Sequence, residues 1–325
     1  MDFSKQIEEL TSVVNQEIRK LFLDKKPLSL YQPMFHLLSA GGKRIRPLLV
    51  ILSCQAVGGK LENCLNAAVA VELLHTFTLV HDDIMDHDAI RRSKPTVHEK
   101  WDEATAILAG DGLVTLAYQV LLKTRHPDLQ EVLKSFTDGL LVLCEGQALD
   151  KEFETREDVS LEAYEEMIEK KTARLIEVSC EMGTILGNAS VEEKKNIGLF
   201  ASSLGKAFQI QDDLLDIMSE EKVSGKPFGS DLIEKKKTYL TIHFINSANP
   251  TDKEKFQRLW KKDLLKREDV LQIRELFNKA GTIESARKII KELILRATKA
   301  LDFLQPGEAK DNLRKLALKI RDRVS

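Results

Sequence analysis

The sequence predicts an all-α fold, a single large helical bundle, and three observations support this prediction. No proline occurs between Asp128 and Lys226, so long helices can form there without meeting the commonest helix breaker. Alternating apolar and polar runs bounded by turn residues, which are typical of strands, are scarce along the chain. Apolar residues instead recur every three or four positions in several segments, as one face of an amphipathic helix requires.

Two helices are predicted in the first hundred residues. Pro47 suits the first position of a helix with the sequence PLLVILSCQAV, because that position has no use for a backbone N–H, and Gly58 and Gly59 would end it. A second helix is predicted over Val71–Asp88, where a long apolar run leads into a group of aspartates.

Two further helices have clear signals at both ends. Ser160 suits an N-cap and Gly187 a C-terminal stop, and between them the apolar positions are Tyr164, Ile168, Leu175, Val178, Met182 and Ile185. Thr282 suits the N-cap of a last helix that ends before Pro306, with an apolar stripe formed by Ile283, Ala286, Ile290, Leu293, Ala297, Leu301 and Leu304.

One domain covering residues 1–325 is the simplest prediction, because the chain has no repeat, low-complexity segment or Pro/Gly/Ser linker. The polar stretch Asn246–Glu254 is the best candidate for a domain break.

Composition excludes several classes of function. The 325 residues include 49 basic and 51 acidic side chains, so the net charge of −2 gives no reason to expect nucleic acid as a partner. The four cysteines lie far apart with no CxxC pair and indicate reduced thiols in a cytoplasmic protein: Cys54, Cys64, Cys144 and Cys180. The first ten residues are charged, unlike a signal peptide, and no apolar run approaches the roughly 18 residues of a membrane span.

The segment HDDIMDHDAIRR contains the first cluster of chemically informative residues. If Val71–Asp88 is helical, His75, Asp82 and Asp86 lie on one stripe with Asp83 beside them. Carboxylates gathered on an otherwise apolar helix repel one another unless a cation joins them, and oxygen ligands favour a hard ion such as Mg²⁺. The adjacent Arg91 and Arg92 supply planar donors suited to phosphate. The cluster therefore predicts a magnesium diphosphate site.

The same spacing returns in FQIQDDLLD, where Asp212, Asp213 and Asp216 repeat the offsets of the first cluster. Two such clusters, each after an apolar helical stretch, could hold several metal ions between two helices. The chain here closely resembles the trans-prenyltransferases, the head-to-tail polyprenyl diphosphate synthases, and is most similar to the short-chain geranylgeranyl and farnesyl diphosphate synthases. The resemblance covers nearly the whole chain. It implies an isoprenoid synthase type of bundle around a central cavity, with the two aspartate motifs facing each other.

The segment GGKRIRP resembles the family's isopentenyl diphosphate motif. The resemblance implies that this diphosphate is held by Lys43, Arg46, His75 and Arg92. Physical reasoning agrees, because Lys43, Arg44 and Arg46 cluster at a predicted helix N-terminus, which itself attracts anions.

Other motifs match family positions around the allylic diphosphate and the reaction centre. The resemblance implies that Arg91, Lys171, Lys226 and Lys236 hold the allylic diphosphate, although Lys235 and Lys237 leave the register of Lys236 open. Thr172, Gln209 and the ring of Phe208 would face the carbocation. Three Mg²⁺ ions are typical of the family, with Mn²⁺ an open alternative, and their ligands would come from Asp82, Asp83 and Asp86 of the first motif and Asp212, Asp213 and Asp216 of the second.

Product length is expected to depend on residues that precede Asp82. Phe77 lies five residues before it, about 7.5 Å along a helix axis, and Thr78 is not aromatic. In the family, this combination of residues accompanies a geranylgeranyl (C20) product. Leu74, deeper along the helix, could move the floor, which is the point where the growing chain stops, in either direction. Farnesyl (C15) and longer products therefore stay open.

Other readings of the motifs were weighed. A terpene cyclase usually has a different second metal motif and lacks the basic GGKRIRP site, and a head-to-head synthase is disfavoured for similar reasons. A di-iron bundle would need a second ExxH besides Glu72–His75, and the sequence contains none. An inactive regulatory subunit of a heteromeric synthase stays open, although such subunits often lack one metal motif. The resemblance also implies a homodimer.

Overall fold

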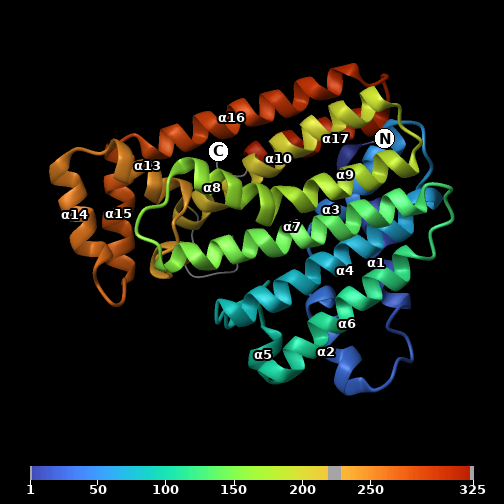
Figure 1. Cartoon of the computed structure of the whole chain (residues 1–325), viewed down its shortest axis with the longest axis horizontal. Coiled ribbons are helices and arrows are strands. Elements are labelled where there is room, and N and C mark those ends of the chain that lie inside the picture. Colours follow the sequence, from blue (N-terminus) through green and yellow to red (C-terminus); the bar gives the residue numbers. More distant parts are fainter. Residues whose placement is uncertain (1, 219–227, 323–325) are drawn as a thin grey trace. The chain divides into compact units, whose positions relative to one another are not determined.

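The computed structural model describes residues 2–218 and 228–322 and confirms the all-α prediction (Figure 1). Helices make up most of this part of the chain. Its only strands are β1 (Ile90–Arg91) and β2 (Lys94–Pro95), which form a short antiparallel hairpin.

The described residues divide into two compact units. The first unit contains residues 2–138, 178–198 and 301–315, and the second contains residues 139–177, 199–218, 228–300 and 316–322. Four helices have residues in both units: α7 (Leu129–Thr155), α9 (Arg174–Leu186), α10 (Val191–Met218) and α17 (Glu308–Arg321).

The first unit is built around α4. Its other helices are α1 (Phe3–Lys20), α2 (Leu28–Ser39), α3 (Ile45–Ala56), α5 (Val97–Lys100), α6 (Glu103–Leu121) and the short η2 (Leu301–Phe303). The central helix α4 (Leu61–Met85) lies beside α6 and also contacts α3 (Figure 1). Residues 48–54 of α3 are buried without a break, because this helix is covered on all sides.

The second unit contains α8 (Leu161–Ile168), the π-helical turn η1 (Glu169–Ala173) and five further helices. These are α12 (Ser230–Ile233), α13 (Tyr239–Ser247), α14 (Pro250–Trp260), α15 (Arg267–Lys279) and α16 (Thr282–Ala300). Helices α13, α14 and α15 meet through the buried rings of Phe244, Phe256 and Phe277, whose centroids lie 5.2–6.0 Å apart. The candidate break at Asn246–Glu254 does not coincide with a boundary between the two units, because α13 and α14 belong to the same unit.

The early helices begin sooner than the sequence signals predict. Helix α3 begins at Ile45, so Pro47 occupies its third position, where the missing N–H is tolerated because first-turn donors have no helical partner. Helix α4 begins at Leu61, ten residues before the predicted start, and ends at Met85 with Asp86 as its C-cap. The aspartates therefore lie at the C-terminal end of a long buried helix.

The later helix signals have mixed outcomes. Ser160 is the N-cap of α8, and its hydroxyl accepts a hydrogen bond from the Ala163 N–H at 3.2 Å. Thr282 is the first residue of α16 and not its cap; its hydroxyl lies 3.2 Å from Nδ1 of His243. The predicted helix from Ser160 to Gly187 is not one continuous α-helix, because the π-helical turn η1 separates α8 from α9.

Two helices, α4 and α6, are long and apolar enough to cross a membrane by length and composition. About 67% of the apolar window of α4 is buried inside the protein, as in a core helix, whereas 39% of the α6 window is buried. Helix α6 therefore keeps an exposed apolar face.

Candidate active site

The loop before α3 carries the first group of predicted site residues. Gly41 and Gly42 have φ values of 83° and 141°, which favour glycine. Nη1 of Arg92 donates a hydrogen bond to the Gly41 carbonyl at 2.6 Å, and a Cβ at Gly42 would lie 3.1 Å from Cζ of Arg92. The structure therefore places Arg92 directly against the loop that carries Lys43.

Arg46 and His75 form the second contact in this group. Nη1 of Arg46 lies 3.1 Å from Nε2 of His75, which suits a neutral imidazole that accepts the hydrogen bond. Burial, followed by the positive charges of Arg46, Arg92, Arg91 and Arg44, lowers the pKa of His75 well below its usual value of 6.5. The predicted isopentenyl diphosphate residues thus share a strongly positive environment within the first unit.

Arg44 does not belong to this anion-facing group, contrary to the expectation from sequence. Its side chain is 2% exposed, and Nη1 lies 2.5 Å from Oε1 of Glu72, which is also 2% exposed. Its Nε donates to Asn15 Oδ1 at 2.9 Å, and its Nη2 donates to the Leu38 carbonyl at 2.7 Å. The guanidinium is therefore buried and bonded to protein groups. A lone glutamate in the apolar run AAVAVELL is a sequence signal for such a buried partner.

The aspartates at the end of α4 point in two directions. Asp82 and Asp86 are partly exposed and lie four residues apart, so they share one stripe of the helix. Asp83 is fully buried, and its Oδ1 accepts a hydrogen bond from Nε of Arg91 at 2.6 Å. Nη2 of Arg91 also donates to Asp88 Oδ2 at 2.7 Å. Asp83 therefore anchors Arg91, whereas Asp82 and Asp86 lie at the surface of the unit.

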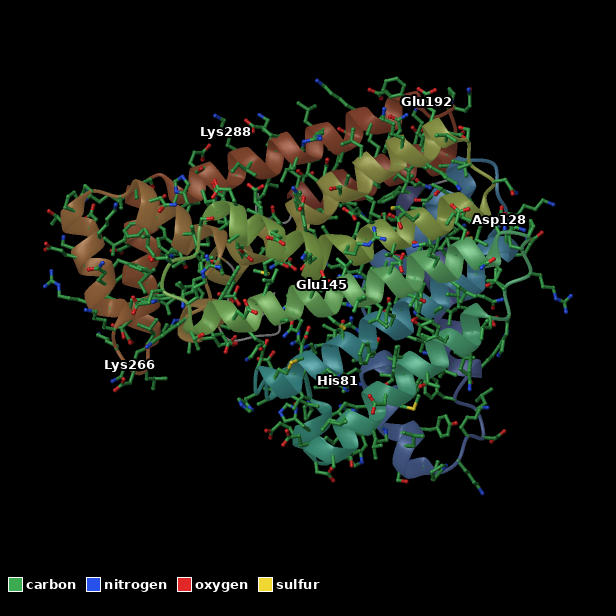
Figure 2. All side chains as sticks on the ribbon, viewed as in Figure 1. His81, Asp128, Glu145, Glu192, Lys266 and Lys288 are labelled. Atoms are coloured by element: carbon green, nitrogen blue, oxygen red, sulfur yellow. The ribbon has the colours of Figure 1, made fainter. Side chains whose placement is uncertain are left out.

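The predicted floor residue, Phe77, lies one turn before the aspartates. Its ring meets that of His81 edge-on, with centroids 4.8 Å apart. His81, labelled in Figure 2, also has Nε2 3.3 Å from the Ile107 carbonyl of α6. Thr78 donates its hydroxyl to the His75 carbonyl at 2.9 Å, and Leu74 is buried in the core. Phe77 is thus fixed by a neighbouring ring.

Lys171 and Thr172 lie on the π-helical turn of the second unit. Nζ of Lys171 lies 2.5 Å from Asp150 Oδ2 of α7. The hydroxyl of Thr172 donates to Gln209 Oε1 of α10 at 2.6 Å. Gln209 follows Phe208, and both are partly exposed. The structure therefore joins Thr172 and Gln209, which the sequence assigned to the reaction centre.

Asp213 is buried and surrounded by protein donors. Its Oδ1 accepts from Nε2 of Gln209 at 2.9 Å, and its Oδ2 accepts from the Tyr164 hydroxyl at 2.6 Å and the Tyr239 N–H at 3.2 Å. Burial, followed by the nearby charge of Asp231, raises the pKa of Asp213 to about 7. This carboxyl positions Gln209. No sequence signal identified Tyr164 or Tyr239 as its partners.

The outer aspartates of the second motif are more accessible. Asp212 and Asp216 are partly exposed and lie four residues apart on α10. Asp216 also receives hydrogen bonds from the Ser230 hydroxyl at 2.7 Å and the Asp231 N–H at 3.1 Å. It therefore fixes the start of α12 through the same carboxylate.

Lys236 and Lys237 have different surroundings. Nζ of Lys236 lies 2.8 Å from Glu234 Oε2, whereas Nζ of Lys237 donates to the Glu154 carbonyl at 3.1 Å. Lys226 lies outside the described residues.

The aspartates suit a hard divalent cation that takes part of its coordination from elsewhere. Each motif offers two partly exposed carboxylates on one helix stripe, at the C-terminal end of a helix where the macrodipole disfavours negative charge. Within residues 2–218 and 228–322, no three His, Cys, Asp or Glu side chains gather closely enough to hold a metal by themselves. Mg²⁺ normally uses one or two carboxylates together with water and substrate phosphates, so the donor set fits it.

Comparisons with known proteins cover almost the whole chain. Residues 27–277 match the family model described as polyprenyl synthetase. The short chain isoprenyl diphosphate synthase of Methanothermobacter thermautotrophicus is 38% identical over 318 residues, covering 98% of this chain and 97% of that protein. The geranylgeranyl diphosphate synthase of Saccharolobus solfataricus is 40% identical over 282 residues, covering 86% and 85%. The crystal structure of geranylgeranyl pyrophosphate synthetase from Pyrococcus horikoshii Ot3 superposes with a TM-score of 0.93 at 40% identity, covering 99% and 98%.

Proposed function

The chain belongs to the polyprenyl synthetase family, and we propose that it condenses isopentenyl diphosphate with an allylic diphosphate, head to tail, to make geranylgeranyl diphosphate. It is a prenyltransferase, and the substrates of this family are small prenyl diphosphates. The observation that carries the proposal is the combination of two aspartate motifs with a separate basic group around His75. Two diphosphate substrates need two binding sites, and only the allylic diphosphate ionises.

The basic group of the first unit would bind isopentenyl diphosphate. Lys43 and Arg92 supply cations beside the Gly41–Gly42 turn, and Arg46 lies against His75. A neutral His75 can both accept a hydrogen bond from Arg46 and donate one from its other nitrogen. Isopentenyl diphosphate keeps its diphosphate because ionisation of a homoallylic C–O bond would give no resonance-stabilised cation, so this group needs only to bind it.

The allylic diphosphate would be held by Arg91, Lys171 and Lys236, and by Lys226 outside the described residues. Asp83 and Asp150 already orient Arg91 and Lys171 at 2.6 and 2.5 Å. Fixed cations stabilise the charge that grows on the leaving diphosphate at little reorganisation cost.

Family catalysis depends on a divalent metal, and we propose Mg²⁺, three ions per active site. Asp82, Asp86, Asp212 and Asp216 would hold them, whereas Asp83 and Asp213 position other residues. When bound, the metal neutralises the diphosphate and makes it a better leaving group.

The reaction needs no side-chain nucleophile. The allylic C–O bond breaks with its electron pair going to diphosphate, the isopentenyl double bond supplies the pair for the new C–C bond, and proton loss restores a double bond. The departing diphosphate takes that proton. Neutral oxygens of Thr172 and Gln209 and the π-face of Phe208 would stabilise the cation without trapping it. Water must be kept from the reaction centre, because it would quench the cation.

Phe77 would set the length of the product. Its contact with His81 keeps the ring from swinging aside, so a growing chain would stop there at C20. Thr78, which bonds to its own helix, and the buried Leu74 would define the surroundings of this floor.

A cytoplasmic homodimer is part of the proposal, with the chain acting as one domain over residues 1–325. Exposed apolar side chains on α6 and at its C-cap support the dimer, because Ile107 and Leu108 are 45% and 61% exposed and the C-cap residue Leu122 is 58% exposed. Such residues suit a permanent interface between two copies.

A product assay tests the proposal. The purified protein is incubated with Mg²⁺, labelled isopentenyl diphosphate and one allylic starter at a time (dimethylallyl, geranyl or farnesyl diphosphate), and the dephosphorylated alcohols are separated by length. A C20 alcohol is expected, and removal of the metal should abolish it. A C15 alcohol, or one longer than C20, would keep the activity and overturn the assigned length. No incorporation with any starter would overturn the activity and favour an inactive subunit of a heteromeric synthase.

A further inference from the structure

The π-helical turn η1 is held from both sides by side chains of α7 and α10. A π-helical turn inserts an extra residue into a helix and is frequent at functional sites. On α7, Glu145 (labelled in Figure 2) lies 3.1 Å from Lys170, and Asp150 lies 2.5 Å from Lys171. Each of these acids pairs with a lysine of the turn.

The α10 side of the turn has a matching set of contacts. Lys206 pairs with Glu169, and Gln209 accepts the hydrogen bond of Thr172 at 2.6 Å. Each residue from 169 to 172 is therefore held by a side chain from a neighbouring helix. The inserted residue is stabilised by tertiary contacts and not by the helix alone.

Gly146 allows the backbone of the turn to approach α7. A Cβ at this position would collide with the Lys171 backbone nitrogen and would lie 2.6 Å from the Lys171 Cα. Both are backbone atoms, so the collision could not be relieved by a side-chain rotation.

Gly205 plays the same part on α10. A Cβ there would lie 2.5 Å from both Cα and Cβ of Ala173. Gly146 precedes Asp150 by four residues, and Gly205 precedes Gln209 by four residues. Residues four apart share a helix face. On both helices, a glycine that admits the turn is followed one helical turn later by the side chain that holds Lys171 or Thr172.

We propose that Gly146 and Gly205 are positioning residues of the reaction centre. They fix the π-helical turn so that Lys171 is held by Asp150 and Thr172 by Gln209. The consequence for catalysis rests on the proposed function. A larger residue at either position would push the turn away and separate Thr172 from Gln209. A displacement of about 1 Å can lower the rate about 100-fold.

The test uses two variants, G146A and G205A, and two matched controls. In Gly198→Ala the same change is made on α10 at a glycine whose Cβ would meet nothing within 4 Å. In Gly183→Ala a Cβ would collide with the Val50 carbonyl, so this control reports tight packing away from the turn. Steady-state kinetics, thermal unfolding and amide hydrogen exchange of residues 169–174 are measured on each full-length protein.

We expect both G146A and G205A to raise amide exchange across residues 169–174 and to lower kcat about 100-fold, with KM for isopentenyl diphosphate changed less than about twofold. Gly198→Ala should leave all values unchanged, and Gly183→Ala should lower Tm without changing exchange in the turn. Wild-type exchange in G146A and G205A, or raised exchange with unchanged kcat, would overturn the proposal.

Two provisions keep the outcome decisive. If G205A fails to fold, G146A carries the test alone, with the same expected result and the same contradicting result. If the wild-type protein has no prenyl transfer activity, the proposed function fails, and the exchange data still decide whether the glycines place the turn.

Discussion

The buried ion pair between Arg44 and Glu72 offers a prediction whose magnitude follows from the structure. Both side chains are 2% exposed, and the pair joins the loop before α3 to the middle of α4. Glu72→Gln removes one charge while keeping the size and an oxygen acceptor. The guanidinium then stays buried with only neutral partners, the Asn15 side chain and the Leu38 carbonyl.

Breaking a buried pair from one side costs about 3–5 kcal/mol of unfolding free energy, because an uncompensated charge remains inside. Unfolding entropy is about 2.1 cal/mol/K per residue, so for 325 residues the expected fall in Tm is about 4–7 °C. The double variant R44M/E72M removes both charges and should recover most of this loss.

The same variant tests a link to substrate binding. Arg44 has φ 49°, and its side chain is the tether of the loop that carries Lys43 and Arg46. A loosened loop should raise KM for isopentenyl diphosphate about tenfold, about 1.4 kcal/mol, and leave KM for the allylic substrate within about twofold.

Calorimetry and substrate-varied kinetics on the wild type, R44M, E72M and R44M/E72M complete a thermodynamic cycle, and Glu72→Gln is measured beside them. Unchanged Tm in Glu72→Gln, or equal changes in both KM values, would refute this account of the pair.

Three other predictions concern the product, the metal and pH. Phe77→Ala should lengthen the alcohols in the product assay, because it removes the ring that meets His81; an unchanged length distribution would rule out Phe77 as the floor. Asp82→Ala should lower kcat about 100- to 1,000-fold, the scale on which loss of one transition-state charge stabiliser acts, and wild-type turnover would contradict its role as a ligand. The folded pKa of His75 lies well below 6.5, so the unfolded chain binds more protons below that pH, and stability present above pH 6.5 is lost as pH falls. His75→Gln should reduce the change of unfolding free energy with pH by up to ~1.4 kcal/mol per pH unit, as measured by urea unfolding between pH 7.5 and 5.5. If the unfolding free energies of the wild type and the variant change with pH in parallel, His75 does not contribute.

The helices and the aspartate motifs could be predicted from sequence because both depend on local spacing. Apolar residues spaced three and four apart predicted helical structure in the segments that follow Ser160 and Thr282. The repeated DDxxD spacing identified the acidic ends of α4 and α10. The early start of α4 was missed because its N-cap is Lys60, which is not one of the residue types that signal a helix start.

The direction of individual side chains could not be predicted. Asp82 and Asp83 are neighbours in sequence, but only Asp83 turns inward, because Arg91 on the hairpin reaches it. Asp213 is enclosed in the same way by Tyr164 and Tyr239, which are distant in sequence. These choices depend on tertiary contacts.

The π-helical turn was also hidden from the sequence. An inserted residue between Ile168 and Leu175 lengthens the spacing between successive apolar residues by one. This spacing already varies between three and four in an ordinary amphipathic helix, so the insertion cannot be seen in the sequence. The role of Gly146 and Gly205 can be recognised only from the structure, because it depends on the turn that packs against them.

The stoichiometry of diphosphate release tests the central claim most directly. With Mg²⁺, an allylic starter and labelled isopentenyl diphosphate, the account predicts one inorganic diphosphate released for each isopentenyl unit incorporated, and almost none when isopentenyl diphosphate is omitted. Release that is equally fast without isopentenyl diphosphate would indicate a cyclase or hydrolase, and no release with either substrate set would contradict catalysis by this chain.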